Sequence, residues 1–185
     1  MKKFYLFLIF SCSLEAQEET PLAATILYET ASELQHIIYI DELYDLAYHN
    51  TDTLEAKGVK KTIELLYKQA LKYYIQLIEE FPTTILVDQA RYEKANIEFN
   101  IKKYDDAKKS YQAVLDKSPI KRNQYESLIA LAFIAFDKNE YQSALEYLEK
   151  AKKYKLEFFC GNDLRSTSLI FENLYTKCLV ALNKK

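Results

Sequence analysis

The chain has 185 residues, of which 49% are apolar and 28% are charged, and this balance favours a folded core over disorder. Only two glycines and three prolines are present, which argues against an all-β chain and favours long helices, because strands need many turns. The formal net charge is −2, with both signs interspersed, so we expect no nucleic-acid partner.

Residues 1–16, MKKFYLFLIFSCSLEA, have the layout of a bacterial secretory signal. Lys2 and Lys3 form a basic start, and an unbroken apolar run from Phe4 to Phe10 follows. This run is too short to span a bilayer. We therefore predict a signal peptide over 1–16 and an exported protein that is periplasmic or associated with the outer membrane. The alternative is a buried N-terminal helix.

The signal leaves three processing points open. Cleavage after Ala16 and cleavage after Ser13 would both release a soluble protein, and Ser13 satisfies the small-x-small rule because Ser11 precedes it. The third possibility is IFSC, which resembles a relaxed lipoprotein box with Cys12 as the lipidated residue. A soluble product is favoured over a lipid-anchored one, because the bulky Phe10 fits this box poorly.

The N-terminal third predicts two long helices. Thr20 and Pro21 form a helix start, since a capping side chain precedes a proline at the first helical position. Apolar residues at helical spacing then predict a helix over 21–48, and after a turn a second helix over 53–80. We expect residues 17–82 to form a long N-terminal helical hairpin that includes a partial repeat.

Three sets of residues recur at a step of 37 positions along the chain, and a repeat is therefore predicted. Within each copy the positions lie along one stripe of a helix, because residues three and four apart are neighbours. In two copies a proline follows, which ends the helix. These sets, the columns of the repeat, are Tyr67, Tyr104 and Tyr141; Ala70, Ala107 and Ala144; and Tyr74, Tyr111 and Leu148.

The other helix of each unit, which precedes the one just described, repeats as well. RYEKANIEF (91–99), LIALAFIAF (128–136) and LYTKCLVAL (174–182) share one frame, in which a small residue stands in the middle. The first two lie 37 residues apart and the third lies 46 residues after the second. The predicted helices after the hairpin are 84–100, 104–117, 123–137, 141–154 and 164–183.

This pairing resembles the tetratricopeptide repeat, and in particular the repeats of bacterial periplasmic and outer-membrane-associated proteins. The resemblance implies an all-α fold in which helical hairpins stack into a superhelix with a concave binding face. It covers residues 83–154 as two full repeats. With the adjoining loops, the expected units are the repeats 83–119 and 120–156, followed by a loop and a C-terminal capping helix over 157–185.

Residues with catalytic or metal-binding potential are few. Glu33-x-x-His36 matches half of a di-iron helix motif, but no second pair exists, and the other histidine, His49, stands alone. No phosphate loop, zinc spacing or nucleophile motif is present. We expect no enzymatic activity, no metal and no cofactor. Cys160 and Cys178 either form a disulfide or remain separate, with Cys178 filling the small-residue position.

The remaining candidate is a surface for a protein partner. By helical spacing and by the resemblance, one wall of the concave face is predicted to consist of Tyr92, Asn96, Ile129, Phe133 and Tyr175. The leading hypothesis is a non-catalytic interaction scaffold of the bacterial cell envelope. Two alternatives remain: a lipid-anchored subunit of an outer-membrane assembly or secretion complex, and a structural or oligomerising helical protein without an open groove.

Overall fold

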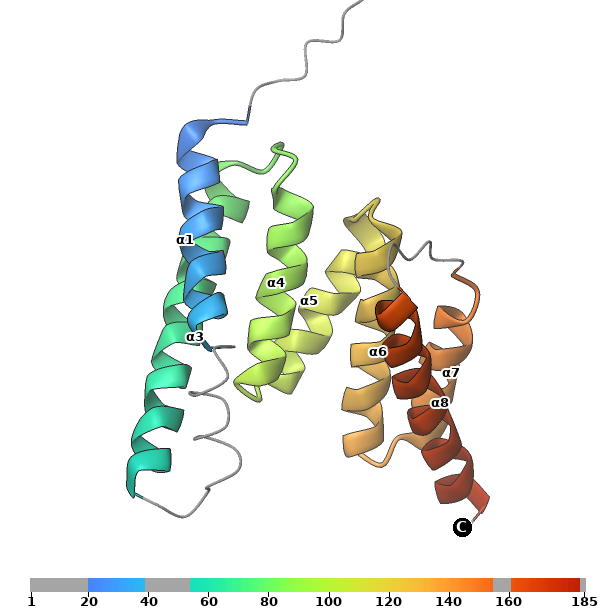
Figure 1. Cartoon of the computed structure of the whole chain (residues 1–185). Coiled ribbons are helices and arrows are strands. Elements are labelled where there is room, and N and C mark those ends of the chain that lie inside the picture. The colour runs from blue at the N-terminus through green and yellow to red at the C-terminus, as the bar shows by residue number, and fades with distance from the viewer. Residues whose placement is uncertain (1–19, 39–53, 155–160, 184–185) are drawn as a thin grey trace, which may run out of the picture.

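All regular structure in the described residues, 20–38, 54–154 and 161–183 of the computed structural model, is α-helical (Figure 1). The prediction of an all-α fold is confirmed to that extent. No helix within these ranges is both long and apolar enough to span a bilayer. The predicted signal peptide and residues 39–48 of the first predicted helix lie outside them. The helices are α1 (Leu22–Ile38), α3 (Leu54–Glu80), α4 (Val87–Asn100), α5 (Tyr104–Lys117), α6 (Lys121–Asp137), α7 (Tyr141–Ala151) and α8 (Gly161–Asn183).

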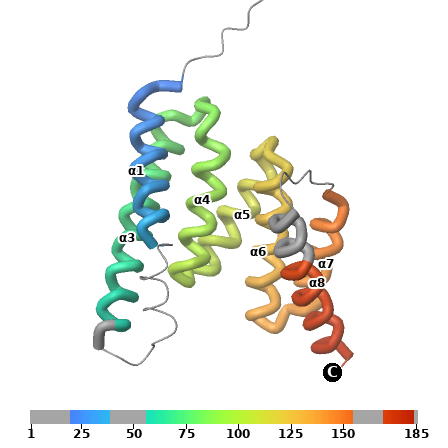
Figure 2. The backbone as a smooth tube through the Cα atoms, in the orientation of Figure 1, coloured from blue at the N-terminus to red at the C-terminus, as the bar shows by residue number. Residues whose placement is uncertain are grey.

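The helices form a row in which each packs against the next, and α1 and α8 lie at opposite ends (Figures 1 and 2). Alternate helices also touch: α4 contacts α6, and α6 contacts α8. In addition, α5 packs against both α4 and α6, and α7 packs against both α6 and α8. Three helices, α4, α6 and α8, therefore make one layer, and α5 and α7 cover the junctions within it.

The repeated small residues lie where neighbouring helices meet. Each is fully buried, and a small side chain at a contact lets two helix axes approach closely. The third column of the repeat is buried beside them: Tyr74, Tyr111 and Leu148 are among the largest fully or nearly fully buried side chains. The fully buried small residues are Ala70, Ala107 and Ala144 in one column, and Ala95, Ala132 and Cys178 in the other.

The turns inside the two central hairpins have the same backbone conformation. Lys102 and Asn139, 37 positions apart, have φ angles of 62° and 60°, in the left-handed region. Each ends its helix in a Schellman arrangement, where the N–H of the next residue reaches back to the helix. These bonds run from Lys103 to the Glu98 carbonyl (2.8 Å) and from Glu140 to the Ala135 carbonyl (2.9 Å).

The N-terminal hairpin joins the row through a shared core. Helix α3 runs for 27 residues without a break, as the sequence predicts. Its buried face and that of α1 form one apolar cluster with α4, and this cluster includes Ile38, Tyr74, Leu77, Val87 and Ile97. Two further clusters follow along the row, one centred on Tyr111 and Leu131 and one on Leu148 and Leu174.

Several helix ends differ from the predicted ones by two or three residues. Helix α4 begins at Val87 rather than at 84, because the Thr84 N–H donates to the Phe81 carbonyl in a turn after Pro82. Helix α6 begins at residue 121 rather than 123, since the Ser118 hydroxyl accepts the Ile120 N–H and closes the preceding turn. Helix α7 ends at 151 rather than 154, and α8 begins at 161 rather than 164.

Candidate interaction surface

The five residues of the predicted wall lie on the three helices of one layer. Tyr92 and Asn96 are on α4, Ile129 and Phe133 on α6, and Tyr175 on α8. Because these helices contact one another in the order α4, α6, α8, their side chains meet at two junctions. The role of each residue depends on whether its side chain is used inside a junction or left open to solvent.

Tyr92 is used at the junction of α4 and α6. Its hydroxyl donates a hydrogen bond of 2.6 Å to the Glu126 carboxylate on α6. Its ring centroid lies 6.5 Å from that of Tyr111 on α5. Burial, and next the charge of Glu126, raise the pKa of the Tyr92 hydroxyl well above its ordinary value. Tyr92 therefore links three helices.

Asn96, one turn further along α4, is also engaged within the fold. Its side-chain oxygen accepts a hydrogen bond of 2.8 Å from the Tyr111 hydroxyl. Its amide nitrogen donates to Glu93 over 3.3 Å. A buried tyrosine hydroxyl needs a partner, and Asn96 supplies it. The side chain remains half-exposed, but its hydrogen-bonding groups are directed toward the protein.

Ile129 lies in the core and not on an open wall. Its exposed fraction is 9%, and it packs in the cluster that contains Leu174 and Cys178 of α8. Residues of the last helix thus share its apolar surroundings. The expected exposure of Ile129 is corrected by this finding, since helical spacing alone does not show which helix covers a face.

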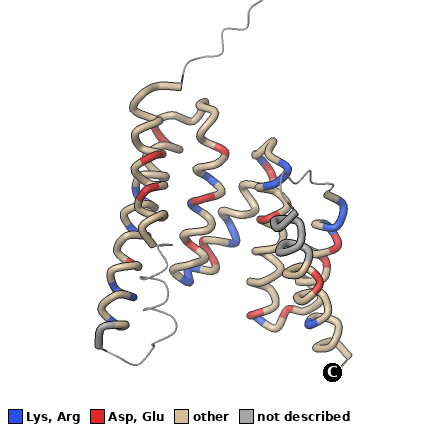
Figure 3. Tube along the Cα trace, viewed as in Figure 1, with Lys and Arg blue, Asp and Glu red and all other residues tan. Residues whose placement is uncertain are grey.

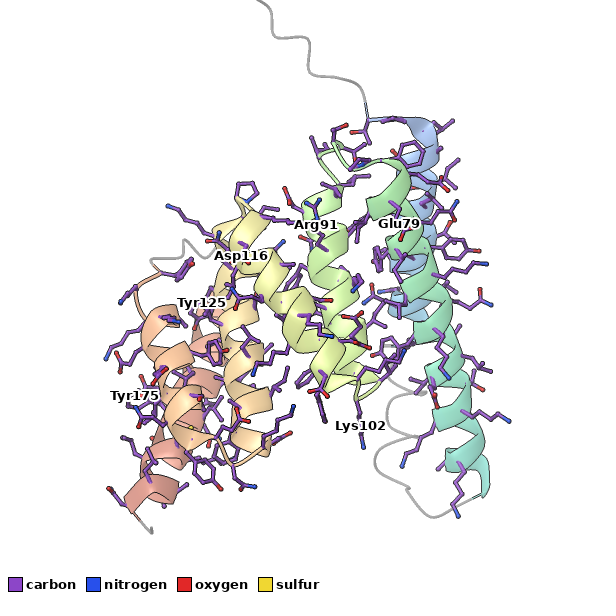
Figure 4. All side chains as sticks on the ribbon, turned by 180° about the vertical axis from the view of Figure 1, so that it is seen from behind. Glu79, Arg91, Lys102, Asp116, Tyr125 and Tyr175 are labelled. Carbon is purple, nitrogen blue, oxygen red and sulfur yellow. The ribbon has the colours of Figure 1, made fainter. Side chains whose placement is uncertain are left out.

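Phe133 and Tyr175 are half-buried at the edge of the same cluster. The Tyr175 hydroxyl donates to Glu149 on α7 over 2.7 Å, and its ring stacks on Phe171 at 5.8 Å. The ammonium group of Lys152, which follows α7, lies 6.0 Å from the ring centroid. Tyr175 thus connects α8 to α7, at the end of the row away from Glu79 (Figure 4). Phe133 keeps part of its ring exposed on α6.

A ladder of polar side chains crosses four helices, α1, α3, α4 and α6, and the sequence analysis missed it. The buried Gln35 of α1 accepts a hydrogen bond of 2.6 Å from the Tyr74 hydroxyl and donates to Glu93 over 3.4 Å. Gln89 also donates to Glu93 (2.8 Å), and Asn123 of α6 donates to Gln89 (3.0 Å). A signal was present, because Gln35 interrupts an apolar stripe between Ala31 and Ile38.

The Glu93 carboxylate places a negative charge within this ladder. Burial, and next the charge of Glu93, raise the pKa values of the Tyr28 and Tyr74 hydroxyls. Both tyrosines therefore stay protonated and remain donors. Along the helices of the described part of the chain, by contrast, acidic and basic positions are interspersed (Figure 3).

The outer face of α5 is polar and solvent-exposed. A shallow groove of about 730 Å³ runs along it, lined by Lys108, Lys109, Gln112 and Asp116 among others. Asp105, at the start of the same face, forms a salt bridge of 2.6 Å with Lys138 in the next hairpin. This bridge lowers the pKa of Asp105 and raises that of Lys138. The face offers charges of both signs and few apolar groups.

The side chains of the types that bind metals or act as nucleophiles lie apart from one another. Within the described residues, no group of three or more His, Cys, Asp or Glu side chains is placed to hold a metal ion. Cys178 is a buried free thiol in the small-residue position, and burial raises its pKa. Its possible partner Cys160, the candidate lipidation site Cys12 and His49 lie outside the described residues, whereas His36 is exposed on α1.

No protein-family model, no curated protein and no solved structure matches the chain.

Proposed function

We propose that this protein is a tetratricopeptide-like interaction module, exported to the bacterial cell envelope, which binds a protein partner on the face of α4, α6 and α8. The observation that carries the proposal is the recurrence of the same contacts at one step along the chain. Fully buried small residues, equal turns at Lys102 and Asn139, and the aromatic pairs Phe99–Tyr104 (5.6 Å) and Phe136–Tyr141 (5.3 Å) all repeat after 37 residues. Stacked hairpins of this kind typically present an extended binding surface.

The binding surface is centred on Phe133. One stripe of α6 carries Arg122, Glu126, Ile129 and Phe133, spaced four, three and four residues apart. Ile129 is buried and Glu126 is bonded to Tyr92 and Arg122, which leaves the half-buried Phe133 ring as the apolar group of the stripe that is partly open to solvent. Aromatic anchors inside a polar rim concentrate binding energy at interfaces. The amide and carboxylate groups of α4 supply that rim.

Export is the second part of the proposal. It is supported by the basic start and apolar run of residues 1–16. A module of this kind works without a catalytic group, a metal or a cofactor, because its function is the recognition of a protein surface.

Site-specific photo-cross-linking in the bacterial cell tests both parts. A benzophenone amino acid replaces Phe133 in one variant and Lys108, on the outer face of α5, in the other. We expect a protein adduct in the envelope fraction for the Phe133 variant and none for the Lys108 variant. Circular dichroism checks that both variants retain the helical fold. Adducts from Lys108 alone, or from neither position, would contradict the proposed surface, and adducts in the cytoplasm would contradict export.

Affinity measurements extend the test once the adduct is identified. Phe133→Asp should weaken binding at least about tenfold, because truncating a buried anchor removes a large part of interface energy. Lys108→Glu should leave the dissociation constant unchanged. If a folded Phe133→Asp protein binds normally, the partner uses another surface.

A further inference from the structure

Helix α8 leaves a wide apolar face uncovered. Leu174 and Cys178 point into the core against α6 and α7, while the opposite side exposes large apolar residues. Exposed groups of this kind on one helix face mark interaction sites more often than isolated surface residues do. The four side chains and their exposed fractions are Leu169 (68%), Ile170 (48%), Leu179 (42%) and Val180 (47%).

The uncovered face of α8 has the spacing of a coiled-coil seam. Residues 169, 173, 176, 180 and 183 follow one another at steps of four, three, four and three. In heptad terms Asn173 and Val180 occupy a positions, and Leu169 and Thr176 occupy d positions. The core-facing Leu174 and Cys178 fall at b and f, so the seam lies on the other side of α8 from these two residues.

The residues that flank the seam are complementary to those of a second copy. Glu172 is at a g position and Lys177 is at the following e position, five residues later. In a parallel helix pair, such a g residue faces the e residue of the other chain. Two Glu172–Lys177 ion pairs would therefore form across a two-fold axis. Both side chains are exposed, and neither has an ion-pair partner among the residues that the structure describes.

A groove beside the seam fits the same arrangement. It has a volume of about 490 Å³ and is lined on the α8 side by Lys177, Ala181 and three residues of the seam, Asn173, Thr176 and Val180, while Phe136 and Tyr141 form its other wall. In a parallel pair, the g side of one helix faces the e side of the other. Leu179, at a g position, would thus lie against this groove in the second copy.

We propose that α8 is a homodimerisation helix, and that two copies of the chain pair in parallel along Leu169, Asn173, Thr176 and Val180. A parallel pair brings Asn173 against its own counterpart, and an asparagine at an a position sets register in parallel dimers. An antiparallel pair would place g positions opposite g positions and e positions opposite e positions, so that Glu172 and Lys177 would no longer face each other. The inference does not depend on the partner-binding face around Phe133, since the seam is made of α8 residues alone.

The protein is purified from the cell in its processed form. Sedimentation velocity then measures the dissociation constant of the dimer. The interface is one helix wide, so we expect dissociation near the micromolar range. Val180→Asp should weaken dimerisation at least about tenfold. Leu65→Asp is the matched control, because Leu65 is exposed to a similar degree (54%) but lies on α3. A protein that stays monomeric at about 100 µM would overturn the proposal.

Charge reversal tests the flanking pairs. Glu172→Lys and Lys177→Glu should each weaken the dimer several-fold, because each places like charges across the axis. The dissociation constant of the double variant should lie within about twofold of the value for the unchanged protein, since the ion pairs are restored with reversed sign. A double variant that stays as weak as the single ones would overturn the pairing.

Cross-linking tests the orientation. Asn183→Cys, with Cys12→Ser, Cys160→Ser and Cys178→Ala, leaves one thiol at a seam position near the end of α8. Parallel helices bring the two thiols together, and oxidation should produce a covalent dimer. Antiparallel helices place them at opposite ends. Circular dichroism checks the fold of this variant, and a folded variant that sediments as a dimer without cross-linking would overturn the parallel arrangement.

Discussion

The Tyr92 hydroxyl joins the first helices of two neighbouring hairpins, because it donates a hydrogen bond to the Glu126 carboxylate over 2.6 Å. A bond to a charged acceptor at a largely buried site contributes more than a neutral one. The carboxylate is also held by Arg122 over 2.9 Å, so the acceptor is fixed in place. This hydroxyl thus helps to hold α4 and α6 together, beside the Asn123–Gln89 bond that also joins them.

Tyr92→Phe should lower the free energy of unfolding by about 1–2 kcal/mol, since it removes this bond and leaves the ring in place. Urea denaturation followed by circular dichroism measures the change. Tyr175→Phe is the control: its hydroxyl bonds to Glu149 at an exposed site, and its effect should be smaller. An equal loss in both variants would show that the Tyr92–Glu126 bond contributes no more to stability than the exposed Tyr175–Glu149 bond does.

The same residue shows what sequence reasoning can establish about the candidate site. Helical spacing correctly groups Tyr92 with Asn96 on α4 and Ile129 with Phe133 on α6. It does not tell which neighbouring helix covers each side chain, and Ile129 is covered by the cluster it shares with α8. Nor does it show that Asn96 is the acceptor for Tyr111, a contact that depends on how two helices pack.

At the scale of the element, the two equal hairpin turns place a non-glycine residue in the left-handed region. This conformation costs an L-residue about 1–2 kcal/mol, and asparagine tolerates it better than lysine does. Lys102 therefore carries strain that Asn139 carries to a smaller degree. The repeat of the turn after 37 residues shows that the bonds closing each helix outweigh this strain.

Lys102→Gly should raise the free energy of unfolding by about 0.5–1 kcal/mol, because the relief of left-handed strain exceeds the extra entropy of a glycine in the unfolded chain. The measurement is thermal or urea denaturation. Asn139→Gly, at the equivalent position, should stabilise less. A destabilised Lys102→Gly protein would mean that the lysine side chain itself supports the turn.

The helices were largely predictable, whereas their ends and turns were not. A strong period and apolar stripes predict the existence of α4 to α8 and the unbroken α3. Helix starts were misplaced by two or three residues, because Thr84 and Ser118 close short turns through hydrogen bonds that carry little sequence signal. The left-handed turns were missed because no glycine marks them.

At the scale of the whole molecule, buried tyrosines link stability to pH. Five hydroxyls in the described part of the chain have a raised pKa; burial is the main cause in four of them, and the hydrogen bond to Glu149 is the main cause in Tyr175. A raised pKa favours the protonated form in the fold, so this stability is fully present below the unfolded value of about 10 and is lost as pH rises above it. The five are Tyr28, Tyr74, Tyr92, Tyr125 and Tyr175.

The free energy of unfolding should therefore fall between about pH 9 and pH 12. Urea denaturation at a series of pH values measures it, and tyrosinate absorbance should rise together with the loss of helical signal. Tyr74→Phe should flatten this dependence, because it removes one of the most strongly shifted groups. Complete tyrosine ionisation in a protein that keeps its helices would contradict the prediction.

In the described part of the chain, the main contacts of each helix are with the next helix and the one after it, and this sets the order in which parts of the molecule fold and unfold. Loops closed during folding are short, so the hairpins α4–α5 and α6–α7 can form without waiting for distant parts of the chain. Local unfolding is limited to neighbouring helices in the same way. When α8 detaches, it exposes the cluster around Leu174, while the cluster shared by α1, α3 and α4 keeps all of its own contacts.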